Sequence, residues 1–148
     1  MKKFTQRRLF TTAFVFSLLF FSCRENKAPG HTKENTIERV FVVNLVKDSL
    51  KQKEYLAYHQ QVWPEVEAGF KKAGYKKISL YRFQNLLVMT IVVPSHASLD
   101  SMGKVAESFD RKCAEWNRTM NTYQIGVEGT EPGQTWVEAG KFYSFSNE

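Results

Sequence analysis

The sequence predicts one α+β domain in which an antiparallel sheet carries two helices on one face. Three observations lead to this fold class. Stretches rich in β-branched and aromatic residues recur along the chain, and two of them are separated by only a short polar turn. Two longer stretches between them place apolar residues at helical spacing. The chain has 148 residues, which is enough for one domain after the N-terminal segment is set aside.

The first strand and the first helix are expected early in this domain. Residues 39–46 are rich in valine, which is typical of a strand. A helix from about residue 50 to residue 73 follows, and Asp48 or Ser49 can cap its first turn. Pro64 interrupts this helix. Because proline fits the first turn of a helix and not its interior, we expect the helix to kink or restart there.

A hairpin, a second helix and a last strand complete the order. Residues 77–83 alternate between apolar and polar side chains, and residues 86–93 form an apolar strand after a short turn. The second helix is expected at about residues 98–121, with an apolar stripe made by Met102, Phe109, Cys113, Trp116 and Met120. The last strand is expected at about residues 136–145. This βαββαβ order predicts the ferredoxin-like arrangement.

The predicted sheet has a second face that the two helices do not cover. Its strands contain aromatic residues, and the chain is too short to supply a third helix. An apolar face of this kind needs a cover, and the natural one is the same face of a second copy. The sequence therefore predicts a twofold homodimer.

The N-terminal segment is typical of an export signal. Four basic residues precede an uncharged run from Leu9 to Phe21, whose 13 residues are fewer than the roughly 20 that a permanent membrane span needs. The segment Phe20-Phe21-Ser22-Cys23 resembles the lipobox of bacterial lipoproteins. We therefore expect residues 1–22 to be a lipoprotein signal peptide and Cys23 to become the lipidated N-terminus. Plain export with cleavage nearby is the alternative.

These features predict where the protein resides. A lipid on Cys23 would anchor the chain to a bacterial membrane that it does not cross, as an extracytoplasmic lipoprotein facing the periplasm or the cell surface. Residues 23–37 are mostly polar and are expected to form a flexible tether. The folded domain is expected at residues 38–148.

The composition argues against several classes of function. Removal of residues 1–22 takes away four positive charges and no acidic residue, so the formal net charge falls from +6 to +2 and no nucleic-acid partner is expected. With Cys23 lipidated, Cys113 is the remaining cysteine, which excludes an intramolecular disulfide. The three histidines, at positions 31, 59 and 96, are not spaced like a zinc site, so no metal is expected.

Tyr55 and His59 lie four residues apart in the first predicted helix and therefore share one face. The stripe continues through the apolar residues Val62, Val66 and Phe70, so a sheet would cover this face. An imidazole at the polar end of a core-facing stripe predicts a small polar cleft. Imidazole has an ordinary pKa of about 6.5 and can donate or accept a proton at neutral pH, although a single helical histidine is more often structural.

Tyr55, His59 and the segment Trp63-Pro64-Glu65 together resemble the L-rhamnose mutarotase family, whose members pair a helical tyrosine and histidine just before a Trp-Pro-Glu. The resemblance covers about residues 39–145, which is nearly the whole predicted domain. It continues through Gly74, Ser79-Leu80-Tyr81, Asn85-Leu86-Leu87, Cys113, Trp116 and Met120.

The resemblance implies a dimeric α+β barrel that interconverts the α and β anomers of a deoxyhexose without a cofactor. It implies that His59 is the proton donor, that Tyr55 contacts the sugar and that Trp116 is the first of two adjacent tryptophans that hold it. Two positions differ from the family pattern. Asn117 replaces the second tryptophan, which makes it a candidate sugar contact of another kind, and Ile78 replaces a sugar-binding tyrosine. The identity of the sugar is therefore left open.

Three functions follow as alternatives. The first is an aldose 1-epimerase, or mutarotase, that acts on L-rhamnose or a related deoxyhexose with His59 as general acid and base. The second is a sugar-binding accessory lipoprotein without turnover, which the changes at Ile78 and Asn117 favour. The third rests on fold analogy alone: barrels of this kind also host cofactorless oxygenases and haem-degrading proteins, and His59 would then be a haem ligand. Trp116, on a core stripe, fits packing and sugar binding equally well.

Overall fold

The computed structural model describes residues 34–147. The predicted signal peptide at residues 1–22, the lipidation site Cys23 and most of the predicted tether lie outside the described residues and stay predictions. Within the described range, no helix is both long and apolar enough to cross a membrane. The elements are, in chain order, β1 Thr36–Leu45, α1 Ser49–Gln60, α2 Pro64–Ala73, β2 Lys77–Phe83, β3 Leu86–Pro94, α3 Leu99–Ser108, α4 Arg111–Asn121, β4 Gln124–Ile125 and β5 Val137–Ala139.

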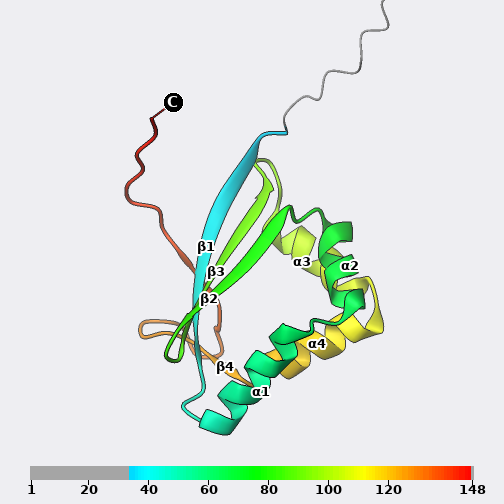
Figure 1. Ribbon diagram of the computed structural model, residues 1–148. Coiled ribbons are helices and arrows are strands. Elements are labelled where there is room, and N and C mark those ends of the chain that lie inside the picture. The colour runs from blue at the N-terminus through cyan, green and yellow to red at the C-terminus, as the bar shows by residue number, and fades with distance from the viewer. Residues whose placement is uncertain (1–33, 148) are drawn as a thin grey trace, which may run out of the picture. The chain divides into compact units, whose positions relative to one another are not determined.

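The sheet has the strand order β2-β3-β1-β4, and β5 also pairs with β1. All of these pairings are antiparallel. Figure 1 shows the four helices together on one side of the sheet. This is the ferredoxin-like βαββαβ arrangement, so the predicted α+β fold class is confirmed. Strand β1 begins at Thr36, slightly before the end of the segment that we expected to be a tether.

Successive side chains of β1 point to opposite faces of the sheet, and the helices cover one of these faces. Val43 and Leu45 belong to the core and are 0% exposed, whereas Val40 and Val42 point to the opposite face and are half-buried. The register extends this pattern to β3, where Leu87 pairs with Val43 and is also buried. The sheet therefore has one core face and one partly exposed apolar face.

The first predicted helix is interrupted at the position that the proline indicated, since Pro64 is the first residue of α2. Asp48, and not Ser49, caps α1. The Asp48 carboxylate accepts hydrogen bonds from the backbone N–H groups of Leu50 at 2.9 Å and Lys51 at 3.1 Å. Helix α2 ends at Ala73, as expected, and the next residue is Gly74, whose φ of 93° lies in the left-handed region.

The second predicted helix is also divided in two, and here the prediction of one continuous helix over residues 98–121 is wrong. Asp110 has an extended backbone and caps α4 by accepting a hydrogen bond from the N–H of Lys112 at 2.8 Å. The apolar stripe continues on both sides of the break. Its spacing therefore could not reveal the interruption.

The last strand is much shorter than the predicted residues 136–145. Only Val137–Ala139 pairs with β1, and the chain leaves the sheet at Gly140, as the red end of the ribbon in Figure 1 shows. The alternating aromatic residues match a strand pattern, but a strand also needs a hydrogen-bonding partner along its edge. Phe142 and Phe145 are consequently 100% and 77% exposed.

Two groups of buried side chains pack between the helices and the sheet. The larger group surrounds the end of α1 and contains Val43, Leu45, Tyr55, Val66, Leu87, Trp116, Met120 and Tyr123. The smaller group lies near α3 and contains Ile91, Val93 and Met102. Tyr55 is 2% exposed, so the helix face that carries it is the face that packs on the sheet, as the sequence predicted.

Gly69 in α2 marks a close approach between helices. A Cβ atom at this position would lie 2.8 Å from the backbone oxygen of Ala106 and 3.2 Å from Sγ of Cys113. We predict that Gly69→Ala lowers the free energy of unfolding by about 1–3 kcal/mol, because the helices must separate to admit the methyl group. Denaturant unfolding measures this change.

The matched control for this prediction is Gly103→Ala in α3, where an added Cβ meets nothing within 4 Å. This variant should be as stable as the wild type or slightly more stable, because alanine favours helix more than glycine does. A Gly69→Ala protein as stable as the wild type would contradict the close helix packing.

Candidate active site

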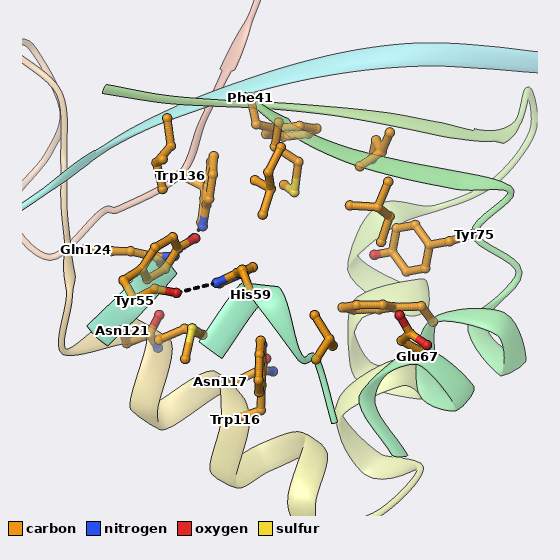
Figure 2. A pocket seen from close by; sticks show the side chains of 18 of the residues that line it. Phe41, Tyr55, His59, Glu67, Tyr75, Trp116, Asn117, Asn121, Gln124 and Trp136 are labelled. Atoms are coloured by element: carbon orange, nitrogen blue, oxygen red, sulfur yellow. Dashed lines mark hydrogen bonds between the residues drawn. The ribbon is translucent and has the colours of Figure 1, made fainter. Parts of the chain in front are cut away.

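A cavity of about 910 Å³ lies between the helices and the core face of the sheet. Polar side chains gather around one end of it, as Figure 2 shows: Tyr55, His59, Asn117, Asn121, Gln124 and Trp136. The four residues that the sequence singled out for binding or catalysis all line this cavity: Tyr55, His59, Trp116 and Asn117. The fold thus brings the candidate residues together, while their chemical roles stay predictions.

His59 lies in the last turn of α1, and a hydrogen bond to the backbone of the same helix sets the tautomer of its imidazole. Its Nδ1 lies 2.9 Å from the carbonyl oxygen of Tyr55, a contact drawn in Figure 2. A carbonyl can only accept, so Nδ1 carries the proton and donates it. In the neutral ring, Nε2 then keeps its lone pair. Within residues 34–147, Nε2 has no protein hydrogen-bond partner, so it is available to accept a proton from a ligand.

The hydroxyl of Tyr55 is oriented by a chain of two hydrogen bonds. Trp136 Nε1 donates to Oε1 of Gln124 at 3.1 Å, and Nε2 of Gln124 donates to the Tyr55 oxygen at 3.4 Å. The indole N–H can only donate, which places Oε1 of Gln124 toward Trp136 and the amide nitrogen toward Tyr55. The phenolic oxygen therefore accepts, and its own proton is left for an acceptor elsewhere. At this end of the cavity Tyr55 acts as a donor.

Burial moves the pKa values of these two groups in opposite directions, and each shift favours the neutral form of its group. Desolvation lowers the pKa of His59 below its ordinary value of 6.5, and the hydrogen bond to the Tyr55 carbonyl opposes this in part. Desolvation raises the pKa of Tyr55, and the hydrogen bond from Gln124 opposes that shift. At neutral pH the site therefore holds a neutral imidazole beside a protonated phenol, with ring centroids 4.2 Å apart.

Trp116 supports the imidazole from α4. It is 5% exposed, and its ring lies edge-on to His59 at a centroid distance of 5.3 Å and to Trp63 at 5.4 Å. Trp116 is thus a core residue that also lines the cavity. Asn117 is half-buried on the same helix, and its side-chain amide makes no hydrogen bond with residues 34–147, so the amide is available to a ligand.

Sequence reasoning missed three polar groups at this end of the cavity. Gln124 is 8% exposed and accepts a hydrogen bond from Trp136, and Asn121 also lines this end of the cavity. Asn121 is the last residue of α4, Gln124 begins β4, and Trp136 directly precedes β5. Strands β4 and β5 both pair with β1. Gln124 contacts a residue 69 positions away, so no local spacing could have indicated it. A buried glutamine between two aromatic partners becomes visible only in the fold.

Other candidate groups have structural roles. Within the described part of the chain, no group of three or more His, Cys, Asp and Glu side chains is arranged to hold a metal ion. Cys113 is buried, and its thiol donates to the carbonyl of Glu65 at 3.3 Å. Ile78 lines the cavity on the sheet side, as a purely apolar wall. His96 is exposed in the loop after β3.

The fold and the site together define an α+β domain with a cavity whose wall carries a histidine and a tyrosine side by side. Comparison with known proteins gives its family. Residues 24–145 match the model of the family described as L-rhamnose mutarotase, and the chain belongs to this family. The resemblance seen in the sequence is therefore confirmed, and the protein is placed among the enzymes that interconvert sugar anomers.

Two known proteins are similar to this chain. An L-fucose mutarotase of Xanthomonas campestris pv. campestris is 30% identical over 109 residues, which are 72% of this chain and 86% of that protein. Among solved structures, the tetracenomycin F2 cyclase of Streptomyces glaucescens, a type-II polyketide cyclase, is similar with a TM-score of 0.44 and 18% identity. That likeness covers 76% of this chain and 99% of the cyclase chain.

The lowered pKa of His59 predicts how stability depends on pH. Between the folded pKa and the ordinary value of 6.5, the unfolded chain binds more protons at this site than the folded chain does. The stability contributed by a neutral His59 is therefore present above about pH 6.5 and lost as the pH falls through the folded pKa. Urea unfolding at several pH values, with wild type compared with His59→Gln, measures this. Parallel pH profiles for the two proteins would contradict the assignment.

Proposed function

We propose that the protein is an aldose 1-epimerase that interconverts the α and β anomers of L-rhamnose or a related deoxyhexose, with His59 as general acid and base. The observation that carries this proposal is the pairing of a neutral imidazole with a protonated phenol on the wall of the cavity. The family supports the reaction class. The L-fucose mutarotase relative makes L-fucose a second sugar to test.

The reaction needs one proton to leave the anomeric hydroxyl and one to reach the ring oxygen. Nε2 of His59 accepts the hydroxyl proton as the bond between the anomeric carbon and the ring oxygen breaks. The imidazolium then gives a proton to the ring oxygen, which yields the open-chain aldehyde. Rotation about the first carbon–carbon bond followed by the reverse steps closes the ring with the other configuration. No proton is gained or lost overall.

The surrounding rings are suited to this proton shuttle. The Tyr55 ring lies 4.2 Å from the imidazole between centroids, tilted by 33°, and an aromatic face at such a distance stabilises a cation. Tyr55 therefore favours the transient imidazolium, although burial disfavours it in the resting site, while Trp116 packs edge-on against the imidazole. The Tyr55 hydroxyl, held as a donor by Gln124, can bind an oxygen of the sugar and fix its position.

Saturation-transfer NMR of the sugar anomers tests the proposal directly. We predict that His59→Gln lowers the enzyme-dependent exchange of L-rhamnose or L-fucose anomers by about 100- to 10,000-fold, the usual contribution of a general acid–base group. His96→Gln, on an exposed loop, is the control and should exchange like the wild type. Equal exchange rates in wild type and His59→Gln would remove the catalytic role.

A sugar-binding protein without turnover is the second candidate. The cavity carries Asn117 and Ile78 where the family resemblance leads one to expect aromatic sugar contacts, which supports altered recognition. Calorimetry separates the two functions. Tight binding of L-rhamnose or L-fucose with no anomer exchange would indicate an accessory sugar-binding lipoprotein.

We also propose that the protein acts outside the cytoplasm of a bacterium, anchored to a membrane through a lipid on Cys23. The support is the sequence of residues 1–23, with its basic start, its short apolar run and its lipobox-like end. On this proposal the catalytic domain meets sugars before or during uptake.

We further propose that two copies of the domain form a twofold dimer through the outer face of the sheet. This face carries the half-buried side chains of Val40, Val42 and Val88, and the exposed rings of Tyr81 and Phe83 extend it along β2. A second copy of the same surface is equally apolar, so the two faces can cover each other. Such interfaces between identical subunits are common.

A charge at the centre of this face should separate the subunits. We predict that wild type has twice the mass of the monomer by light scattering and that Val88→Lys is monomeric, because the lysine would be buried without a partner. Val105→Lys, at an exposed position of α3, is the matched control and should remain dimeric. A monomeric wild type would contradict the proposed interface.

A further inference from the structure

We propose that the cavity takes a reducing saccharide longer than one sugar ring, with the second ring in a subsite marked by Tyr75. This inference rests on the proposed function, because the first ring is the one whose anomers exchange at His59. It assigns a role to the part of the cavity that the proton-transfer chemistry does not use.

The size of the cavity is the first observation. Its volume is about 910 Å³. Pockets of roughly 300–1,000 Å³ usually hold drug-sized ligands and bury most of their surface. A single deoxyhexose is much smaller than such a ligand. One ring at His59 would therefore leave the remainder of the cavity filled with water.

The position of Tyr75 is the second observation. Figure 2 shows Tyr75 at the opposite end of the cavity from Tyr55, with its hydroxyl oxygen directed into the space. Its ring is held in place by an edge-on contact with Phe70, at a centroid distance of 5.7 Å. Within residues 34–147 the hydroxyl has no hydrogen-bond partner, and burial raises the pKa of Tyr75, so the group stays protonated. It is a fixed donor and acceptor that the protein itself leaves unused.

The wall between the two polar ends is the third observation. It includes the apolar side chains of Phe41, Met89 and Ile78 on the sheet side and those of Phe70 and Leu99 on the helix side. Sugar rings combine apolar CH faces with hydroxyl groups at their edges, so an apolar wall between polar contacts suits them.

These observations together select a class of ligand. An apolar substituent on the first ring would fill the far end of the cavity but would leave the Tyr75 hydroxyl without a partner, which costs free energy. A single deoxyhexose bound at His59 would leave much of the 910 Å³ cavity unfilled. A second sugar ring supplies a hydroxyl for Tyr75 and an apolar face for the wall, while the first ring keeps its free anomeric hydroxyl at His59.

The test compares anomer exchange for two probes: free L-rhamnose, and L-rhamnose that carries a second sugar on O3 or O4. We expect kcat/KM of wild type to be higher for the disaccharides than for L-rhamnose. Tyr75→Phe should reduce the ratio of the two kcat/KM values by about 2- to 10-fold, the effect of losing one neutral hydrogen bond. Tyr143→Phe, on the exposed C-terminal segment, is the matched control and should leave the ratio unchanged.

The outcomes separate this inference from the proposed function. Exchange of L-rhamnose with slower or absent exchange of the disaccharides would overturn the subsite and leave the mutarotase intact. A ratio unchanged by Tyr75→Phe would also overturn it, because something other than a second ring would then occupy the far end. Exchange of neither probe would overturn both proposals.

Discussion

The hydrogen bond from Nδ1 of His59 to the carbonyl of Tyr55 is the interaction on which the site depends. It joins two residues one helical turn apart, so the backbone of α1 sets the tautomer of the imidazole before any ligand binds. The free lone pair on Nε2 follows from it. Because both side chains stand on one rigid helix, the base and the neighbouring phenol keep their relative position without help from loops.

The rest of the fold builds a cavity around this pair. The helix ends shortly after His59, and α2 restarts at Pro64, so the aromatic side chains around the break pack together beneath the imidazole. Trp63 and Tyr58 both contact Trp116, which in turn contacts His59. On the other side, Gln124 in β4 and Trp136, directly before β5, form the hydrogen bonds that orient the Tyr55 hydroxyl. The same aromatic residues thus pack the core and surround the candidate base.

Much of this arrangement could be predicted from the sequence, because the signals were local. Valine-rich strands, the proline at the start of α2 and the four-residue spacing of Tyr55 and His59 each depend on near neighbours. The break before α4 was missed because an aspartate cap can interrupt a helix without disturbing its apolar stripe. The short β5 was missed because strand length depends on the partner edge as well as on the residue pattern. Gln124 and Tyr75 enter the cavity only through tertiary contacts, which no spacing reveals.

Nitrogen-15 NMR of the His59 ring tests the tautomer most directly, because the chemical shifts of the two ring nitrogens report which of them carries the proton. At a pH above 6.5, we predict a protonated Nδ1 and an unprotonated Nε2, with the Nε2 chemical shift perturbed when L-rhamnose or L-fucose is added. A ring protonated on Nε2, or an Nε2 chemical shift that stays the same when either sugar is added, would contradict this assignment.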